Sequence, residues 1–283
     1  MWVAETSTIL WIDVEAGSVF EGRLVGDRIE EGWKLDFDGR VGAAVPGTDG
    51  SVLVATADRL VVVAPSGGGR TGGPLIIPAG QHSRTNDGAC DPAGRMLVGT
   101  LALDDREGQE SLYRVEDDGS LTTLDSDLGL SNGLGWSPDG TLFYNTDTDS
   151  GIIWVRDYDA ASGATGPRRL HLRIEDGHPD GLCVDSRGYL WVAVWGAGEV
   201  RSFTPDGGLV ALVKVAAPHT SSVAFVGDSL DTLLITTASR DLSEADRKQY
   251  PDAGRLFLAD VGVTGSPTFP WSASWRDSIA SER

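Results

Sequence analysis

Several features are missing from this 283-residue sequence, and each absence argues against a class of protein. No apolar run approaches the roughly 20 residues of a membrane-spanning helix, so we do not expect an integral membrane protein. The two cysteines, Cys90 and Cys183, are too few for a disulfide framework and too far apart in sequence for a chelating pair. No Gly-x-Ser-x-Gly segment is present, which argues against a serine esterase of the α/β-hydrolase type.

Positive charge is also scarce, since 23 Lys and Arg face 42 Asp and Glu, for a formal net charge of −19. This charge repels phosphate backbones and anionic lipid, so we expect neither a nucleic acid nor a membrane as partner. The first residues, MWVAETST, contain no basic segment and no apolar secretion signal. We therefore expect a cytoplasmic protein, and nothing in the sequence sets its oligomeric state.

Glycine, by contrast, is abundant at 37 residues and follows a regular period. A turn residue, a glycine and a short β-branched or aromatic run recur at intervals of about 45 residues, the period of a propeller blade. Ser7 and Asp231 occupy the turn position of two further runs near the ends, which makes six repeats. The four clearest runs are DGSVLVAT (49–56), AGRMLVGT (93–100), DGTLFYNT (139–146) and RGYLWVAV (187–194).

Each run is followed by a second apolar stretch and another turn, so each repeat holds about four short strands. Four strands in a repeat of this length make one propeller blade. We predict an all-β fold, a six-bladed β-propeller with four-stranded blades, over residues 1–270. Residues 239–250 are expected to form a loop with a turn or two of helix. The tail, 271–283, lacks the repeat, and we expect it to be loosely ordered.

Polar residues recur at one position of this repeat. The first strand of a propeller blade lines the central channel, and the residue eight positions before the repeat glycine enters that strand. In three consecutive blades this residue is Asn86, then Asn132, then Asp180. Taken singly, each is an ordinary turn residue before glycine, but their shared register favours convergence on the channel axis. Two amide oxygens and a carboxylate suit Ca²⁺, Mg²⁺ or Mn²⁺ better than a structural zinc, and a catalytic Zn²⁺ stays open.

Three further residues are candidates for the same site. Arg84 lies two residues before Asn86, and strand alternation places it on the same face, near an anionic or hydroxylated substrate; a surface salt bridge is the alternative. Asp87 and Asp147 are predicted to hold neighbouring site residues by accepting hydrogen bonds.

The segments that carry these residues resemble the family of senescence marker protein, gluconolactonase and luciferin-regenerating enzyme. RTNDGACDPAGRMLVGT resembles its R-x-N-D-G segment, SNGLGWSPDG its S-N-G-L-x-W-S segment, and HPDGLCVDSRGYLWVA its P-D-G-x-x-x-D segment. The resemblance spans nearly the whole chain. It implies a six-bladed propeller with one divalent cation on its axis and lactone hydrolysis as the typical activity.

Carried over by position, the resemblance implies that Asn132 and Asp180 are metal ligands and that Asp180 is the general base. Asn86 and Arg84 would contact the substrate or a metal-bound water, and Asn86 is also a candidate ligand. One departure concerns the family's G-E-G-P-x-W segment, whose glutamate is a metal ligand. Trp2 takes the place of that tryptophan, so the glutamate would precede Met1. We expect either a start further upstream, leaving the first blade truncated here, or an incomplete metal site.

The leading hypothesis is therefore a metal-dependent hydrolase of a small sugar lactone, similar to a gluconolactonase, with Ca²⁺, Zn²⁺, Mn²⁺ or Mg²⁺ as cofactor. Two alternatives stay open. One is a propeller that binds a ligand or partner without chemistry, and the other is a hydrolase of other esters or phosphotriesters.

Overall fold

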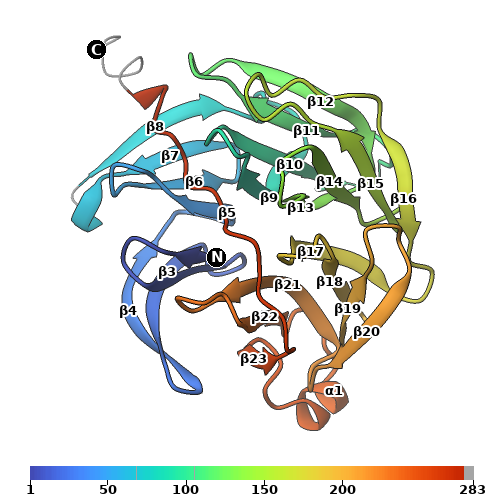
Figure 1. The fold of residues 1–283 in the computed structure, drawn as a ribbon. Helices are drawn as coiled ribbons and strands as arrows, with labels where there is room; N and C mark the ends of the chain where they lie inside the picture. Colours follow the sequence, from blue (N-terminus) through green and yellow to red (C-terminus); the bar gives the residue numbers. More distant parts are fainter. Residues whose placement is uncertain (68, 105, 277–283) are drawn as a thin grey trace.

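The fold is described by a computed structural model that covers residues 1–67, 69–104 and 106–276. Over these residues the regular secondary structure is almost entirely antiparallel β-strand, and the sheets are grouped around a common axis (Figure 1). The described exceptions are the helix α1 (Glu244–Gln249) and a 3-10 turn (Pro65–Gly67). No described helix has the length and hydropathy that a membrane span requires. The predicted all-β, propeller-like architecture is confirmed.

Four of the sheets have four strands each, taken in chain order. They are β1 (Trp2–Val3), β2 (Thr8–Asp13), β3 (Ser18–Val25) and β4 (Arg28–Asp36); β5 (Val41–Pro46), β6 (Val52–Thr56), β7 (Arg59–Val63) and β8 (Arg70–Leu75); β9 (Ser83–Cys90), β10 (Met96–Ala102), β11 (Glu110–Val115) and β12 (Leu121–Leu128); β13 (Ser131–Trp136), β14 (Leu142–Asp147), β15 (Ile152–Asp157) and β16 (Arg169–Arg173).

The remaining strands form one seven-stranded sheet, so the prediction of six four-stranded blades is wrong. The set β17–β20 joins the three-stranded set β21–β23 through a single residue pair, Trp195 of β18 with His219 of β21. The rings of these two residues stack at 4.2 Å, which holds the strand ends in pairing distance. The sheet contains β17 (His178–Val184), β18 (Leu190–Trp195), β19 (Glu199–Phe203), β20 (Leu209–Lys214), β21 (His219–Val226), β22 (Thr232–Ala238) and β23 (Leu256–Asp260).

The repeated runs of the sequence all form the second strand of a set, namely β2, β6, β10, β14, β18 and β22. The turn before each run needs one residue with positive φ, which Ser7 supplies at the first run with φ 49°. At the last run Leu230 adopts φ 51°, so the turn lies one residue before the predicted Asp231. The helical excursion is confirmed, because α1 begins after Ser243, whose hydroxyl accepts a hydrogen bond from the Asp246 N–H.

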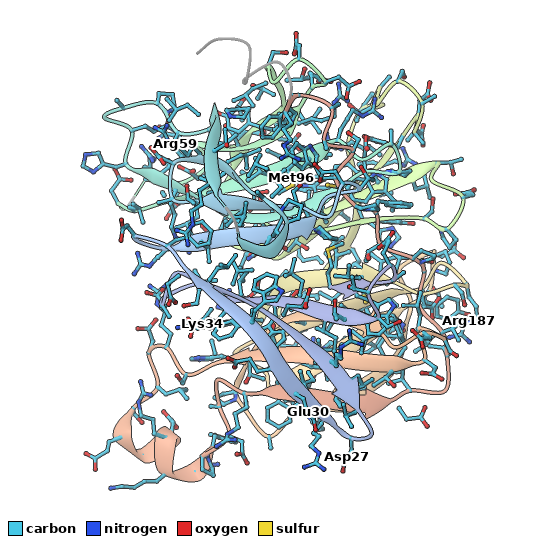
Figure 2. The ribbon with its side chains drawn as sticks, turned by 90° about the vertical axis from the view of Figure 1, so that its left-hand side faces the viewer. Asp27, Glu30, Lys34, Arg59, Met96 and Arg187 are labelled. Atoms are coloured by element: carbon cyan, nitrogen blue, oxygen red, sulfur yellow. The ribbon has the colours of Figure 1, made fainter. Side chains whose placement is uncertain are left out.

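The strands before these runs face the centre. Figure 1 shows β5, β9, β13, β17 and β21 around the axis, and adjacent members of this group contact one another. The side view in Figure 2 shows charged side chains such as Asp27 and Arg187 at the periphery, whereas Met96 lies inside, where it is fully buried. The apolar residues are therefore packed between neighbouring sheets, and the inner strands are left to line a channel.

The segment after β23 runs across one end of this channel to the edge of the second sheet (Figure 1). The Trp271 N–H donates to the Pro46 carbonyl at 2.8 Å, and Ser272 N–H donates to the Gly94 carbonyl. Trp271 and Trp275 are 0% and 1% exposed, and both belong to the core cluster between the second and third sheets. The expectation of a loosely ordered tail is thus wrong for residues 271–276, since two indoles provide the apolar area that anchors them. Residues 277–283 lie outside the described part, and the division at residue 270 stays a prediction.

Replacing one of these anchors should cost stability. We predict that Trp271→Ala lowers the free energy of unfolding by about 3–5 kcal/mol, because a buried indole is lost and a cavity remains. Urea unfolding followed by circular dichroism measures this. The matched control is Leu209→Ala on β20, where the side chain is 57% exposed and the change should be within about 0.5 kcal/mol. Equal effects of the two variants would contradict the packing described here.

Candidate active site

A cavity of about 1790 Å³ occupies the centre of the ring and is lined by all five inner strands. The side chains predicted from sequence register, Asn86, Asn132 and Asp180, all line it, as does Arg84. They come from β9, β13 and β17, which belong to three different sheets. The structure therefore brings together four residues from three separate strands, of which the first and the last, Arg84 and Asp180, are nearly a hundred positions apart along the chain.

Irregular pairing of the inner strands aims these side chains at the cavity. Each of β5, β9, β13, β17 and β21 shifts register against its partner strand near the middle, as a β-bulge does. In β9 the shift spans Asn86 and Asp87, in β13 it follows Asn132, and in β17 it spans Asp180. A bulge releases a residue from the ladder and turns its side chain, so these polar groups point to the axis instead of alternating across the sheet.

Close approach of the inner strands accompanies these bulges. A Cβ at Gly133 would lie 2.5 Å from the carbonyl oxygen of Asp180, and one at Gly181 would collide with the Ser222 side chain. Glycine is therefore required directly after Asn132 and after Asp180, because any side chain would push β13, β17 and β21 apart. The sequence shows this signal as Asn-Gly and Asp-Gly at the shared register.

A chain of hydrogen bonds connects the polar residues across the cavity wall. Arg84 Nη1 donates to Asn86 Oδ1 at 3.1 Å, and Asn86 Nδ2 donates to Asn132 Oδ1 at 3.0 Å. Asn132 Nδ2 then donates to Thr148 Oγ1 at 3.0 Å, and Thr148 Oγ1 donates to the Pro179 carbonyl at 2.7 Å. The chain thus ends on the peptide unit that precedes Asp180. Such a network fixes the rotamers of both asparagines.

Two carboxyl groups share this cavity, Asp87 and Asp180. Burial raises the pKa of Asp180 well above its usual value, and the charge of Asp87 adds to the effect, whereas the Gly181 N–H opposes it. Burial likewise raises the pKa of Asp87 to about 6, against a hydrogen bond from the Gly88 N–H at 2.7 Å. Neither carboxyl is ion-paired to a side chain of the described residues. Both are therefore acidic groups that a cation in the cavity would stabilise in the ionised form.

Asp147 and Asp87, both predicted to accept hydrogen bonds from neighbouring site residues, differ in the hydrogen bonds that they accept. Asp147 accepts hydrogen bonds from the Gly129 and Leu130 N–H groups at 3.1 and 3.3 Å, so it fixes the segment that leads into β13. Asp87 itself lines the cavity, and within the described part of the chain it accepts a hydrogen bond only from the Gly88 N–H. Sequence reasoning missed Thr148, which joins β13 to β17 and follows Asp147 directly; its adjacency to a predicted site residue was the only signal.

The ligand chemistry of these residues fits a hard divalent cation. Asn86, Asn132 and Asp180 offer amide and carboxylate oxygens. Burial raises the pKa of the two thiols that line the cavity, Cys90 and Cys183, and His178 is the one imidazole among its described lining residues. Among the described residues, no group of three or more His, Cys, Asp or Glu side chains is gathered closely enough to hold a metal ion. The amide oxygens would therefore have to supply part of any coordination shell.

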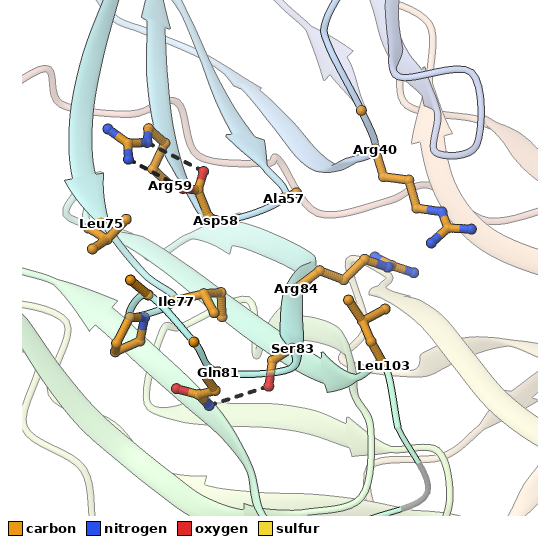
Figure 3. Close-up of a pocket in the computed structure, with 14 residues that line it drawn as sticks. Arg40, Ala57, Asp58, Arg59, Leu75, Ile77, Gln81, Ser83, Arg84 and Leu103 are labelled. Carbon is orange, nitrogen blue, oxygen red and sulfur yellow. Dashed lines mark hydrogen bonds and ion pairs between the residues drawn. The ribbon is translucent and has the colours of Figure 1, made fainter.

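A second, smaller cavity of about 520 Å³ opens beside Arg84 (Figure 3). Arg84 lines both cavities, and Arg40 lines the smaller one opposite the apolar side chains of Leu75, Ile77 and Leu103. Arg84 is 6% exposed, and burial lowers its pKa to about 10, helped by the positive charges of Arg40 and Arg240 and opposed by Glu15. The guanidinium of Arg84 is thus placed where two cavities meet.

Comparison with known proteins assigns this arrangement to a family. The family model described as "SMP-30/Gluconolactonase/LRE-like region" matches residues 1–239 of this chain. The chain belongs to the SMP-30/gluconolactonase/LRE-like family. This agrees with the resemblance of the three segments that contain Asn86, Asn132 and Asp180.

Named relatives of this SMP-30/gluconolactonase/LRE-like chain include enzymes and a calcium-binding protein. The chain is 33% identical to the pentonolactonase XacC of Haloferax volcanii, covering 95% of this chain and 92% of that one. It is 30% identical to regucalcin of Danio rerio, covering 96% and 93%. The crystal structure of a calcium-binding protein, regucalcin, from Agrobacterium tumefaciens superimposes with a TM-score of 0.88 at 26% identity, covering 96% and 91%.

The close approach of β13 and β17 gives a direct prediction. We expect Gly133→Ala to lower the free energy of unfolding by about 1–3 kcal/mol, because its methyl group must displace the Asp180 backbone. The control is Gly72→Ala on β8, where a Cβ meets no atom within 4 Å. Both are strand glycines, so the comparison isolates the clash. Urea unfolding of the two variants measures it, and a Gly133→Ala variant as stable as Gly72→Ala would refute the tight approach.

Proposed function

We propose that this protein is a metal-dependent lactonase that hydrolyses a sugar (aldono)lactone. The observation that carries the proposal is the hydrogen-bonded series from Arg84 through Asn86 and Asn132 to the backbone beside Asp180. It joins a guanidinium, two amides and a hydroxyl beside the Asp180 carboxyl in one concave site, which is the arrangement expected where binding and chemistry occur together. The pentonolactonase among the relatives supports the same reaction class.

In this proposal Asn132 and Asp180 hold one divalent cation, with Asn86 as a further oxygen donor. The bound cation would polarise the lactone carbonyl and make a water molecule more acidic. Oxygen ligands favour Ca²⁺, Mg²⁺ or Mn²⁺, and Zn²⁺ belongs in the same test. A cation at this place would lower the pKa of both Asp87 and Asp180, whose ionised forms burial disfavours.

The protein groups would then divide the work of hydrolysis. Asp180, as carboxylate, accepts a proton from the water that attacks the lactone carbonyl carbon. Arg84 and Asn86 orient the substrate: Arg84 through its Nε and Nη2, which make no hydrogen bond to described residues, and Asn86 by accepting a hydrogen bond from Arg84 Nη1 and so fixing the guanidinium. When the ring C–O bond breaks, the proton passes to the ring oxygen, and the product is a hydroxy acid. Thr148 acts by positioning, since its hydroxyl accepts the Asn132 amide hydrogen bond and thereby sets which way the amide faces.

A non-catalytic ligand-binding propeller is the second candidate. It is favoured by the absence, among the described residues, of a third carboxylate beside Asp87 and Asp180. Such a site would bind a cation weakly and could bind a ligand without turnover. Hydrolysis of other esters or phosphotriesters by the same groups is a variant of the first candidate, which a substrate panel distinguishes.

The central experiment is a panel of aldonolactones, with simple esters and a phosphotriester, assayed with Ca²⁺, Mg²⁺, Mn²⁺ or Zn²⁺ and with chelator. We expect chelator-sensitive turnover of lactones and a loss of at least about a hundredfold in kcat in Asp180→Asn, because its amide cannot accept the proton. Asp206→Asn, in the exposed turn between β19 and β20, is the control with unchanged activity. Turnover that resists both chelator and Asp180→Asn would contradict the proposal.

A second prediction separates positioning from folding. We expect Thr148→Val to weaken Mn²⁺ binding by about 10–100-fold, because Asn132 loses the partner that fixes its amide. Thr148→Ser keeps the hydroxyl and should restore most of the affinity. Calorimetric titration with Mn²⁺ measures this without any assay of turnover. If valine and serine variants bind Mn²⁺ equally, Thr148 has only a packing role.

A further inference from the structure

Three arginines from separate parts of the chain lie at or beside one side of the central cavity: Arg84 and Arg240 line it, and Arg40 lines the smaller cavity that Arg84 shares. Arg40 precedes β5, Arg84 lies in β9, and Arg240 follows β22, so they come from loops or strand starts of different sheets. In Figure 3 the guanidinium groups of Arg40 and Arg84 extend toward the same side of the smaller cavity. The chain as a whole carries a formal net charge of −19, whereas three guanidinium groups gather here.

Glu15, in the turn between β2 and β3, holds two of these arginines in place. Its Oε2 accepts from Arg40 Nε at 2.9 Å and lies 2.8 Å from Arg40 Nη2. Its Oε1 accepts from Arg240 Nη1 at 3.1 Å. One carboxylate thus bridges two guanidinium groups and neutralises only one of them, and the Arg40 hydrogen bond keeps the pKa of Glu15 below its usual value.

Arg84 has no such partner among the described residues. Its donors reach only two neutral oxygens, the Thr85 carbonyl at 2.7 Å and Asn86 Oδ1 at 3.1 Å, both through Nη1. Its Nε and Nη2 make no hydrogen bond to described residues, although the side chain is nearly buried and lines both cavities. A buried guanidinium without a carboxylate is costly, and an anionic group of a ligand would offset that cost.

Two carboxylates face the arginines at this end. Glu15 bridges Arg40 and Arg240, and Asp241 pairs with its neighbour Arg240 at 3.0 Å, so these two arginines are matched by two carboxylates. Asp149 and His178 also line the cavity, but they belong to the fourth and fifth sets of strands, across the ring from Glu15. The uncompensated charge of the positive region, which we define as Arg40, Arg84 and Arg240, is therefore that of Arg84.

We propose that the substrate carries a second, anionic group besides the lactone, and that Arg40, Arg84 and Arg240 bind it at the cavity mouth. This inference rests on the proposed lactonase function and specifies its substrate class. A carboxylate and a phosphate share the chemistry that a guanidinium recognises, since both accept paired N–H donors. The lactone ring would lie toward Asn132 and Asp180, with its charged substituent toward Arg84.

The test compares three lactones that differ in this substituent: a neutral aldonolactone, an aldarolactone with a free carboxylate, and a phosphorylated aldonolactone. We expect at least one of the two charged lactones to have a higher kcat/KM than the neutral lactone. Comparing the two charged lactones then shows whether the site prefers a carboxylate or a phosphate. In Arg40→Gln and Arg240→Gln the ratio of kcat/KM for charged over neutral lactone should fall about tenfold or more, mainly through KM, because a charge-assisted hydrogen bond is lost.

Arg169→Gln is the matched control, because Arg169 is also paired with a carboxylate, that of Asp157, but lies on the outer strand β16. Calorimetric binding of an open-chain sugar diacid provides a readout without turnover, and Arg40→Gln should weaken it. If lactones are hydrolysed with no preference for charge, the inference is overturned while the lactonase function stands. If no lactone is hydrolysed but the diacid binds through Arg40, the anion site stands and the lactonase function fails.

Discussion

The close approach of the inner strands is the constraint on which the rest of this structure depends. Wrapping the sheets around one axis protects their edges, but it brings the first strand of each set against its neighbours. At Gly133 and Gly181 no side chain fits between adjacent strands. The register shifts beside these glycines turn Asn132 and Asp180 into the cavity. The strand packing that closes the ring therefore also places the polar side chains of the site.

This arrangement buries ionisable groups, and removing them from water costs free energy. Asp87 and Asp180 are buried in a cavity, which raises the pKa of both carboxyl groups, and Arg84 is nearly buried with neutral hydrogen-bond partners among the described residues. Such groups reduce the stability of a protein unless a ligand or ion offsets their desolvation. The apolar packing between sheets, including the two tryptophans of the C-terminal segment, supplies the stability that lets the chain retain them. The proposed cation and the proposed anionic substituent would each relieve one part of this cost.

The repeat in the sequence predicted the strands well because the turns have a strong local signal. Its register also identified Asn86, Asn132 and Asp180, since equivalent positions in successive blades face the same axis. The seven-stranded sheet was not predictable, because it depends on one pair, Trp195 with His219, that follows no repeat. Trp271 was expected in a loose tail because its segment has no period, although its indole fills the core. Local patterns cannot reveal contacts of this kind.

The same limit applies to the site. Thr148 enters through a hydrogen bond to another sheet, and Glu15, Arg40 and Arg240 meet only because distant loops end at the same mouth. Sequence spacing carries no trace of that convergence. Arg84 was found because it shares a strand face with Asn86, whereas its lack of an acidic partner among the described residues appears only in three dimensions.

The claim that the bulged inner strands build a cation site is tested most directly by a crystal structure of the protein soaked with Mn²⁺, with the ion located by anomalous scattering. The account predicts one ion at coordination distance, about 2–2.6 Å, from oxygen atoms of Asn132 and Asp180. An ion bound elsewhere, for instance at Asp147 and Asp149 with the central cavity left to water, would contradict it.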